Sequence, residues 1–166
     1  MWRSNFDDQE CEIFDAETLH FAAFLLLDDI CEWLVNEKAR ISDLDKISSI
    51  GTPLYCALSA RASFFSTNVG HSDVLMYKEA KSWTFECLLD AGAKMDIRIH
   101  PKVDRTLLAS SLKADFGWQM LLSRGVILDD STLEVAEELS RRGEGLGEQF
   151  LLEVSDQNLD ENIRLK

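Results

Sequence analysis

The chain has 166 residues, and 46% of them are hydrophobic, which is enough to form a packed core and excludes a wholly disordered protein. Its formal net charge of -13 at pH 7 argues against a nucleic-acid partner, because that affinity depends on Lys and Arg side chains that neutralise phosphates. The longest uncharged apolar run, residues 21–27, is too short to cross a membrane, and the first residues lack the basic and apolar regions of a signal peptide. We therefore expect a cytoplasmic protein with no membrane partner, and a nuclear location stays open.

Residues 1–16 form an acidic segment in which carboxylates alternate with apolar side chains. We expect a solvated helix or loop that covers the helices after it. The alternative, a cation site, would need the D-x-D-x-D-G order of a calcium loop, and that order is absent here.

A first pair of helices is predicted over 17–24 and 28–37. Asp28 and Asp29 would lie in the first turn of the second helix, where carboxylates interact favourably with the helix dipole. Five apolar side chains then recur at the spacing of one buried helix face: Ile30, Cys31, Trp33, Leu34 and Val35. The polar, turn-rich stretch 40–50 follows and predicts a loop.

The stretch 51–58 predicts the start of a third helix. Thr52 at the N-cap can accept a hydrogen bond from a free backbone N–H, and Pro53 suits the first helical position because a donor there would have no partner. The small and apolar residues that follow would let this helix pack closely against a neighbour: Leu54, Cys56, Ala57 and Leu58.

A further helix is predicted over 81–91. Its apolar face would consist of Trp83, Cys87 and Leu88, and Gly92 would end it. The loop expected over 96–105 is the most basic part of an otherwise acidic chain. Its basic side chains are Arg98, His100, Lys102 and Arg105.

The last third of the chain predicts shorter helices. Thr106 opens one helix, and Gly117 would weaken the start of the next. Ser131 and Thr132 would cap a helix over 133–141, and a short helix over 149–154 would precede an acidic tail. The glycines at positions 143, 145 and 147 would break the chain between these two helices. They form no nucleotide site, because a phosphate loop needs a Lys-Ser/Thr pair and a preceding strand.

Two short phrases alternate along the chain. The helix opening at 52–57 has weaker copies at 18–23 and 106–109. Two apolar residues shortly before a helix stop recur at 34–39, 88–93 and 121–126. The first two openings are about 35 residues apart, close to the 33-residue period of a repeat class with a T-P-L-H-x-A signature. By these motifs, residues 17–126 resemble the ankyrin-repeat family.

The resemblance implies an all-α fold, an ankyrin-like solenoid of about three stacked antiparallel helix pairs with projecting hairpin loops. It divides the chain into an acidic capping segment (1–16), a divergent repeat domain (17–142) and a C-terminal helix with an acidic tail (143–166). Lys38 stands where the family has a glycine. The second repeat holds an insertion, 61–80, which either forms a functional loop or lengthens the two helices. In the second case the side chains packed between them would be Phe64, Phe65 and Met76.

The resemblance also implies a function. Ankyrin repeats bind proteins through hairpin tips and the inner helix face, so we expect a protein-protein interaction scaffold with no catalytic residue, cofactor, metal or small-molecule substrate. The candidate partner-binding residues are Phe24, Leu25, Asp43, Lys46, Ser59, Arg98, His100, Lys102 and Arg105. The net charge leaves an alternative open, an acidic regulatory or inhibitory domain that shields a basic site of a partner or of a longer parent chain.

The cysteines and histidines have plainer roles than catalysis. The four cysteines are widely separated and form no C-x-x-C pair, so neither a disulfide framework nor a zinc site is expected. His20 occupies the family's histidine position, where the ring ties the turn to the helix through hydrogen bonds. Cys56 could lie beside His20 across stacked helices, but apolar surroundings would raise the thiol pKa and leave it unreactive.

Overall fold

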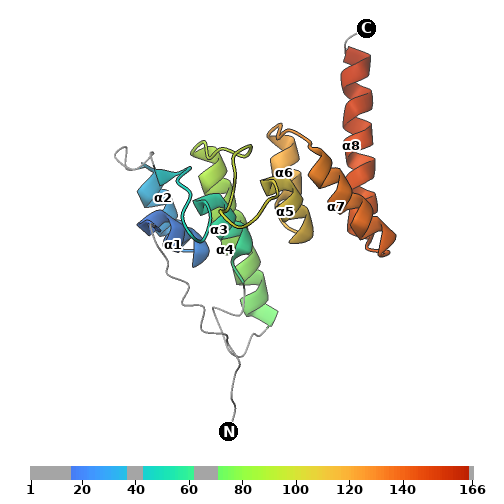
Figure 1. Cartoon of the computed structure of the whole chain (residues 1–166). Helices are drawn as coiled ribbons and strands as arrows, with labels where there is room; N and C mark the ends of the chain where they lie inside the picture. The colour runs from blue at the N-terminus through green and yellow to red at the C-terminus, as the bar shows by residue number, and fades with distance from the viewer. Residues whose placement is uncertain (1–15, 37–42, 62–70, 165–166) are drawn as a thin grey trace.

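The fold is entirely helical over the residues that the computed structural model describes, which are 16–36, 43–61 and 71–164. Eight helices follow one another in pairs along a row, and the described residues form no strand, so the predicted all-α class is confirmed (Figure 1). Isolated bridges join Ser48 to Gly51 and His100 to Val103 in the two loops that were expected. In chain order the helices are α1 (Thr18–Phe24), α2 (Asp28–Asn36), α3 (Pro53–Ser59), α4 (His71–Asp90), α5 (Leu107–Lys113), α6 (Trp118–Ser123), α7 (Asp130–Arg141) and α8 (Gly145–Arg164).

The first helices of the pairs begin at side-chain caps. Thr52 and Thr106 each accept a hydrogen bond from the backbone N–H three residues further on, at 3.2 Å in both cases. Pro53 occupies the first turn of α3, as predicted. α1 begins instead with a capping box between Glu17 and His20. Each cap satisfies a donor that the helix itself leaves free, so the local sequence alone places these helix starts.

The predicted helix stops at Gly92 and Gly125 are confirmed. Both glycines adopt left-handed backbone conformations, with φ of 92° and 75°. The backbone N–H groups of Ala93 and Val126 then donate to carbonyls five residues earlier, at 3.0 and 3.2 Å. This pattern closes the helix end and needs a residue that tolerates positive φ.

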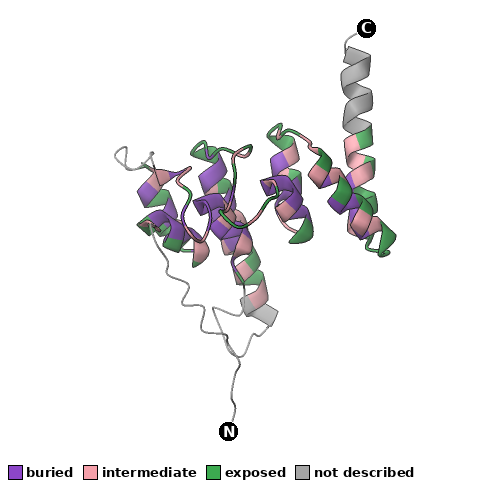
Figure 2. Ribbon diagram, viewed as in Figure 1, coloured by how far each residue is buried: buried purple, intermediate pink, exposed green. Residues whose placement is uncertain are grey.

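One hydrophobic core runs through all the helix pairs, from Leu19 in α1 to Phe150 in α8 (Figure 2). Aromatic rings join neighbouring pairs. Phe85 of α4 meets Phe116 with ring centres 5.5 Å apart, and Trp118 of α6 meets Phe150 at 5.6 Å. Both contacts are edge-to-face, the arrangement that ring quadrupoles favour. Each pair therefore buries part of its apolar surface against the next.

α4 is longer than the sequence predicted. It begins at His71 rather than at residue 81, so residues 71–80 belong to the helix. Residues 71–80 of the insertion therefore lengthen α4, which is one of the two alternatives that the sequence left open. Four predicted features lie outside the described residues: the segment 1–15, Lys38, Phe64 and Phe65.

Several apolar side chains that the pattern assigned to buried positions lie at the surface. The exposed fractions are 43% for Ile30, 59% for Trp33, 68% for Met76 and 66% for Trp83. Cys31 and Leu34 of α2 and Leu88 of α4 are buried as expected, and α4 also buries Phe85, which the predicted face did not include. Apolar residues occupy more than one face of each helix, so spacing alone could not show which face meets the core.

α7 starts earlier than predicted and has a different cap. It begins at Asp130, and the cap is Asp129, whose carboxylate accepts a hydrogen bond from the backbone N–H of Thr132 at 2.7 Å. Thr132 is buried inside the first turn rather than placed at the cap. The Asp129 carboxylate accepts a hydrogen bond from a backbone N–H group that the helix leaves free, and its negative charge is favourable near the N-terminus of α7.

The three glycines near the C-terminus do not all end a helix. Gly143 ends α7 with a φ of 75°, but Gly145 and Gly147 lie within α8, which replaces the short helix expected over 149–154. A Cβ atom on Gly147 would come within 2.4 Å of the backbone oxygen of Ala136, so this glycine permits close packing of α8 on α7. α4 and α8 have 20 residues each, and no described helix is both long and apolar enough to cross a bilayer.

Candidate interaction groove between α2 and α4

Lys46, a candidate in the first loop, links that loop to the start of α1. Its Nζ atom pairs with Glu17 Oε1 at 2.5 Å, and its backbone oxygen accepts a hydrogen bond from His20 Nε2 at 2.8 Å. Nδ1 of His20 accepts in turn from the backbone N–H of Glu17 at 3.1 Å, so the ring is neutral and carries its proton on Nε2. Burial lowers the pKa of His20, although the hydrogen bond to Lys46 opposes the shift. The predicted role of His20 in tying a turn to a helix is confirmed.

The basic hairpin 96–105 also uses its polar groups to keep its own shape. The Arg98 guanidinium donates to the backbone oxygens of His100, at 3.3 Å, and of Pro101. His100 Nδ1 accepts from the backbone N–H of Lys102 at 2.9 Å. Partial burial and then the charges of Lys102 and Arg98 lower the pKa of His100. The Lys102 side chain is exposed, and no hydrogen bond of its amine to another described residue is seen.

The remaining candidates are dispersed over the surface. Phe24 is half-buried against the core, and Leu25 at the end of α1 is 40% exposed. Ser59 donates its hydroxyl back to a carbonyl of its own helix at 3.2 Å, and Asp43 is half-buried at the start of its turn. Arg105, at the end of the basic hairpin, lines a cavity of about 380 Å³ beside α7.

The two hairpins lie side by side and are joined by backbone hydrogen bonds. The backbone N–H of Lys94 donates to Asp45 Oδ1 at 2.8 Å, and that of Thr52 donates to the oxygen of Ile99 at 2.8 Å. The structure thus brings the two hairpins into one neighbourhood.

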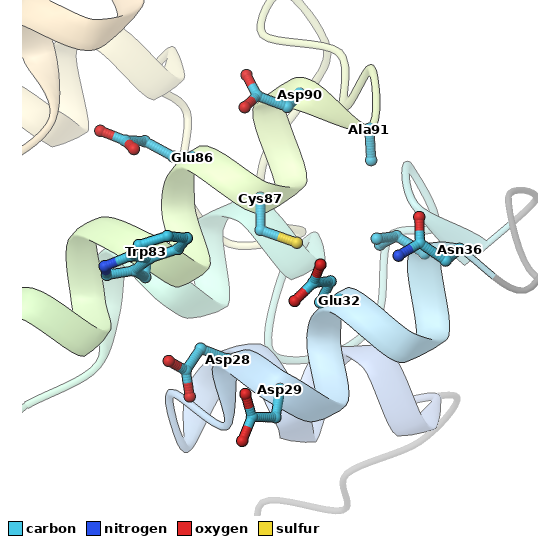
Figure 3. Close-up of a pocket in the computed structure, with 10 residues that line it drawn as sticks. Asp28, Asp29, Glu32, Asn36, Trp83, Glu86, Cys87, Asp90 and Ala91 are labelled. Carbon is cyan, nitrogen blue, oxygen red and sulfur yellow. The ribbon is translucent and has the colours of Figure 1, made fainter.

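A larger groove, which the sequence did not predict, lies between the second helices of the first two pairs. It has a volume of about 620 Å³ and is open to solvent along one side (Figure 3). α2 and the C-terminal half of α4 form its two walls. The lining residues are Asp28, Asp29, Glu32, Val35, Asn36, Trp83, Glu86, Cys87, Asp90 and Ala91.

Helical periodicity places these side chains. On α2 the lining positions are 28, 29, 32, 35 and 36, and on α4 they are 83, 86, 87 and 90, followed by residue 91 just after the helix, so each wall is one stripe at offsets of three, four and seven residues. The neighbouring stripe of each helix, which includes Cys31 and Leu34 on α2 and Leu88 on α4, is buried in the core. Core packing therefore turns the two lining stripes toward one another.

The groove is acidic and partly apolar. It holds five carboxylates, those of Asp28, Asp29, Glu32, Glu86 and Asp90, and none of the described residues that line it is basic. Asp90 pairs at the rim with Arg124 of the next helix pair, at 2.6 Å. Trp83 supplies the largest apolar surface and is 66% exposed. In Figure 3 its indole lies on the α4 wall, facing the opening above Asp28.

Cys87 lies on the α4 wall with its sulfur directed toward α2 and the Glu32 carboxylate (Figure 3). Its pKa is raised, first by burial and then by the charges of Glu32 and Asp90. Burial also raises the pKa of Cys31 and of Cys56 to about 12. The expectation that apolar surroundings would raise the Cys56 pKa is confirmed, and at neutral pH these thiols are protonated and weakly nucleophilic.

The arrangement suits recognition by charge and contact area. Among the described residues, no three His, Cys, Asp or Glu side chains are placed to hold a metal ion. His20 and His100 each use a ring nitrogen to accept a backbone hydrogen bond, and neither lines the groove. A site that combines several carboxylates with an exposed indole can attract and hold a cationic group.

One signal in the sequence could have revealed the groove. Carboxylates recur on α2 at 28 and 32 and on α4 at 86 and 90, each pair four residues apart, and both pairs flank apolar residues. Their meeting depends on packing between segments more than fifty residues apart, which a single sequence does not show. No protein-family model matches the chain, and neither a curated protein nor a solved structure resembles it significantly.

Proposed function

We propose that this chain is a non-catalytic protein-interaction module, an ankyrin-like solenoid that binds a protein partner through the groove between α2 and α4. The observation that carries the proposal is Trp83, a large indole that is 66% exposed on the wall of a 620 Å³ groove. Exposed aromatic surface beside a hollow is typical of docking sites, where Trp is among the residues that contribute most to binding.

Local features support the ankyrin-like part of the proposal. Two of the pairs open at a threonine cap, at Thr52 and Thr106, and two end at a left-handed glycine, at Gly92 and Gly125. Bridged hairpins precede α3 and α5, and a backbone hydrogen bond from Thr52 to Ile99 links one hairpin to the next. Stacked units of this kind bury their apolar faces on each other and offer an extended surface for partners.

The hairpin tips and the inner helix face are a second candidate surface. Arg98 and Lys46 support it less than expected, because both side chains already bond within the chain. Lys102 and Leu25 remain exposed and available. The groove is the better supported of the two surfaces, because it combines a defined volume, exposed aromatic area and one sign of charge.

A photo-crosslinking experiment tests the groove. Benzoylphenylalanine replaces Trp83 in one variant, Trp33 in a second and Lys102 in a third, and each variant is irradiated in extract from the cells that express the protein. Trp33 is the matched control, since it is 59% exposed on α2 but lines no part of the groove. We expect a protein adduct from position 83 that excess wild-type protein suppresses and excess Trp83→Ala protein does not. Adducts only from position 102 would move the docking surface to the hairpins, and equal adducts from all three positions would contradict a groove-specific partner.

The five carboxylates of the groove also favour the alternative function, an acidic domain that shields a basic site. The two functions differ in their dependence on salt and on Trp83. An electrostatic shield loses affinity steeply between about 50 mM and about 500 mM salt and is insensitive to Trp83→Ala. A groove binder depends on the indole, and the part of its affinity that comes from contact area persists in salt.

A further inference from the structure

We infer that the groove between α2 and α4 receives an arginine-containing basic segment of the partner protein, with a guanidinium over Trp83 and between the Glu32 and Glu86 carboxylates. This inference rests on the proposed function and specifies the chemistry of the partner. The inferred peptide segment is cationic rather than acidic or purely apolar.

Charge complementarity is the first argument. The five carboxylates come from both walls of the groove, and Arg124, which pairs with Asp90, is the basic residue recorded at the rim. Carboxylates on both walls make the electrostatic potential in the groove negative, and a negative potential attracts a cation. The groove is therefore complementary to a positively charged segment.

Two segments of the chain itself suit the groove less well than a basic peptide does. The segment 1–16 has five carboxylates and a single arginine, so its charge has the same sign as the groove. The basic hairpin of a second copy is a poor fit as well, because Asp96 and Asp104 offset its charge and Arg98 bonds within its own loop. A different protein is the occupant that the charge pattern favours.

The indole is the second argument, and it is independent of the carboxylates. Trp83 presents its ring to solvent at the groove, and the cation–π contacts of the described residues both involve Lys81, over Tyr77 and over Phe116, and not Trp83. Trp is the strongest of the aromatic side chains at holding a cation over its face. Arginine fits better than lysine, because its planar guanidinium stacks on the ring while donating hydrogen bonds to carboxylates at its edge.

The third argument is that a second exposed apolar side chain lies on the same face of α4 as Trp83. Met76 is 68% exposed and lies seven residues before Trp83, so the two share one helix face about 10 Å apart. The half-buried Ala80 lies between them. The partner segment should therefore place an apolar side chain on Met76, about 10 Å from its arginine.

The experiment uses a defined probe and the full chain. The probe is a fluorescein-labelled peptide of about 12 residues with three arginines and two leucines in a glycine and serine background, a length that one helical groove accommodates. The control peptide replaces each arginine with citrulline, which keeps the shape and removes the charge. Fluorescence anisotropy measures binding at about 50 mM and about 150 mM salt. Circular dichroism and thermal unfolding verify that every variant keeps the wild-type fold.

Two variant pairs separate this groove from general attraction to an acidic protein. Trp33→Ala is the control for Trp83→Ala. The double variant Glu134→Lys/Glu137→Lys is the control for the double variant Glu32→Lys/Glu86→Lys, because it has the same net charge and changes carboxylates that line the smaller cavity. We expect each groove variant to weaken the arginine peptide at least about tenfold and each control to change it less than about threefold. The citrulline peptide should bind at least about tenfold more weakly than the arginine peptide.

Several results would overturn the inference. One is equal weakening by the groove and control charge variants, and another is unchanged binding to Trp83→Ala. A homodimer in sedimentation velocity that Trp83→Ala dissolves would show that a second copy occupies the groove. If the position-83 adduct forms but neither the peptide nor the charge variants affect it, the arginine inference fails while the proposed function stands. If the peptide binds as expected but position 83 captures no protein, the proposed function fails instead.

Discussion

The Nε2 atom of His20 in α1 lies 2.8 Å from the backbone oxygen of Lys46, across 26 residues of sequence. The other ring nitrogen accepts the backbone N–H of Glu17 at 3.1 Å, so one neutral imidazole joins the helix start to the following loop. Protonation of Nδ1 would remove that acceptor. The pair thus links the protonation of one ring to the closure of the first helix pair.

His20→Leu should destabilise the protein by about 1–2 kcal/mol at pH 7.5, because two partly buried backbone groups lose their partner. The pKa of His20 is lowered by burial, so the unfolded chain takes up this proton first as the pH falls. The stability that neutral His20 contributes is present above its unfolded pKa of about 6.5 and is lost as the pH falls from there through the folded pKa.

Urea denaturation of wild type and His20→Leu at several pH values between about 7.5 and about 5 measures this. The difference in unfolding free energy between the two proteins should shrink toward the acid end. A difference that stays constant over this range would show that His20 does not titrate between the folded and unfolded states.

Lys81 is a buried cation whose removal should stabilise the protein. It is 7% exposed, its Nζ atom donates to the Ala60 backbone oxygen at 3.3 Å, and it lies 4.7 Å from the centre of the Phe116 ring. Burial lowers its pKa to about 8. Since the unfolded chain keeps this proton to a higher pH, the wild-type protein should gain stability from pH 8 toward about pH 10.5.

Lys81→Met should therefore be more stable than wild type by about 1–2 kcal/mol at pH 7, because Tyr77 still donates to the Ala60 oxygen while the buried charge is gone. The advantage should disappear as the pH approaches about 10. Chemical denaturation of both proteins at matched pH values gives the difference directly. Equal stabilities at pH 7 would mean that the Lys81 ammonium is well solvated in the folded state.

Gly147→Ala and Gly145→Ala should have opposite effects. A Cβ atom at position 147 would lie within 2.4 Å of the Ala136 oxygen and 2.5 Å from the Ser140 nitrogen, so α8 must move away from α7. We expect a loss of about 2 kcal/mol or more. At position 145 nothing lies within 4 Å, and alanine should stabilise the helix by about 0.5–1 kcal/mol. Thermal unfolding of both variants tests this, and equal shifts would contradict the close contact of α7 with α8.

Thr84→Val should stabilise the protein, whereas Thr132→Val should destabilise it. Both threonines are fully buried, but Thr84 Oγ1 has no hydrogen-bond partner among the described residues, and Thr132 Oγ1 donates to Asp129 at 3.0 Å. Removing an unsatisfied buried hydroxyl should gain about 1 kcal/mol, and removing a bonded one should cost about 1–2 kcal/mol. Denaturation midpoints of the two variants give the signs, and destabilisation by Thr84→Val would indicate a buried water on that hydroxyl.

The sequence by itself determined the helix starts at Thr52 and Thr106, the stops at Gly92 and Gly125, and the bridging role of His20. The caps and stops depend on residues three to five positions apart, whose backbone and capping geometry is local, whereas the bond from His20 to Lys46 spans 26 residues and was expected from the family resemblance. The all-α class follows from the same signals. The interaction module and its ankyrin-like character stay proposals that rest on them.

Only the tertiary structure decided which faces of the helices are exposed. Trp33 and Trp83 fit the apolar pattern as well as Leu34 and Phe85 do, and the choice between them depends on how α2 and α4 pack on their neighbours. The groove arises in the same way, because its carboxylate stripes are remote in sequence and meet only after packing. Local chemistry sets where a helix begins and ends, whereas burial of a shared core sets its rotation about its own axis, and that rotation placed the acidic stripes and the indole together.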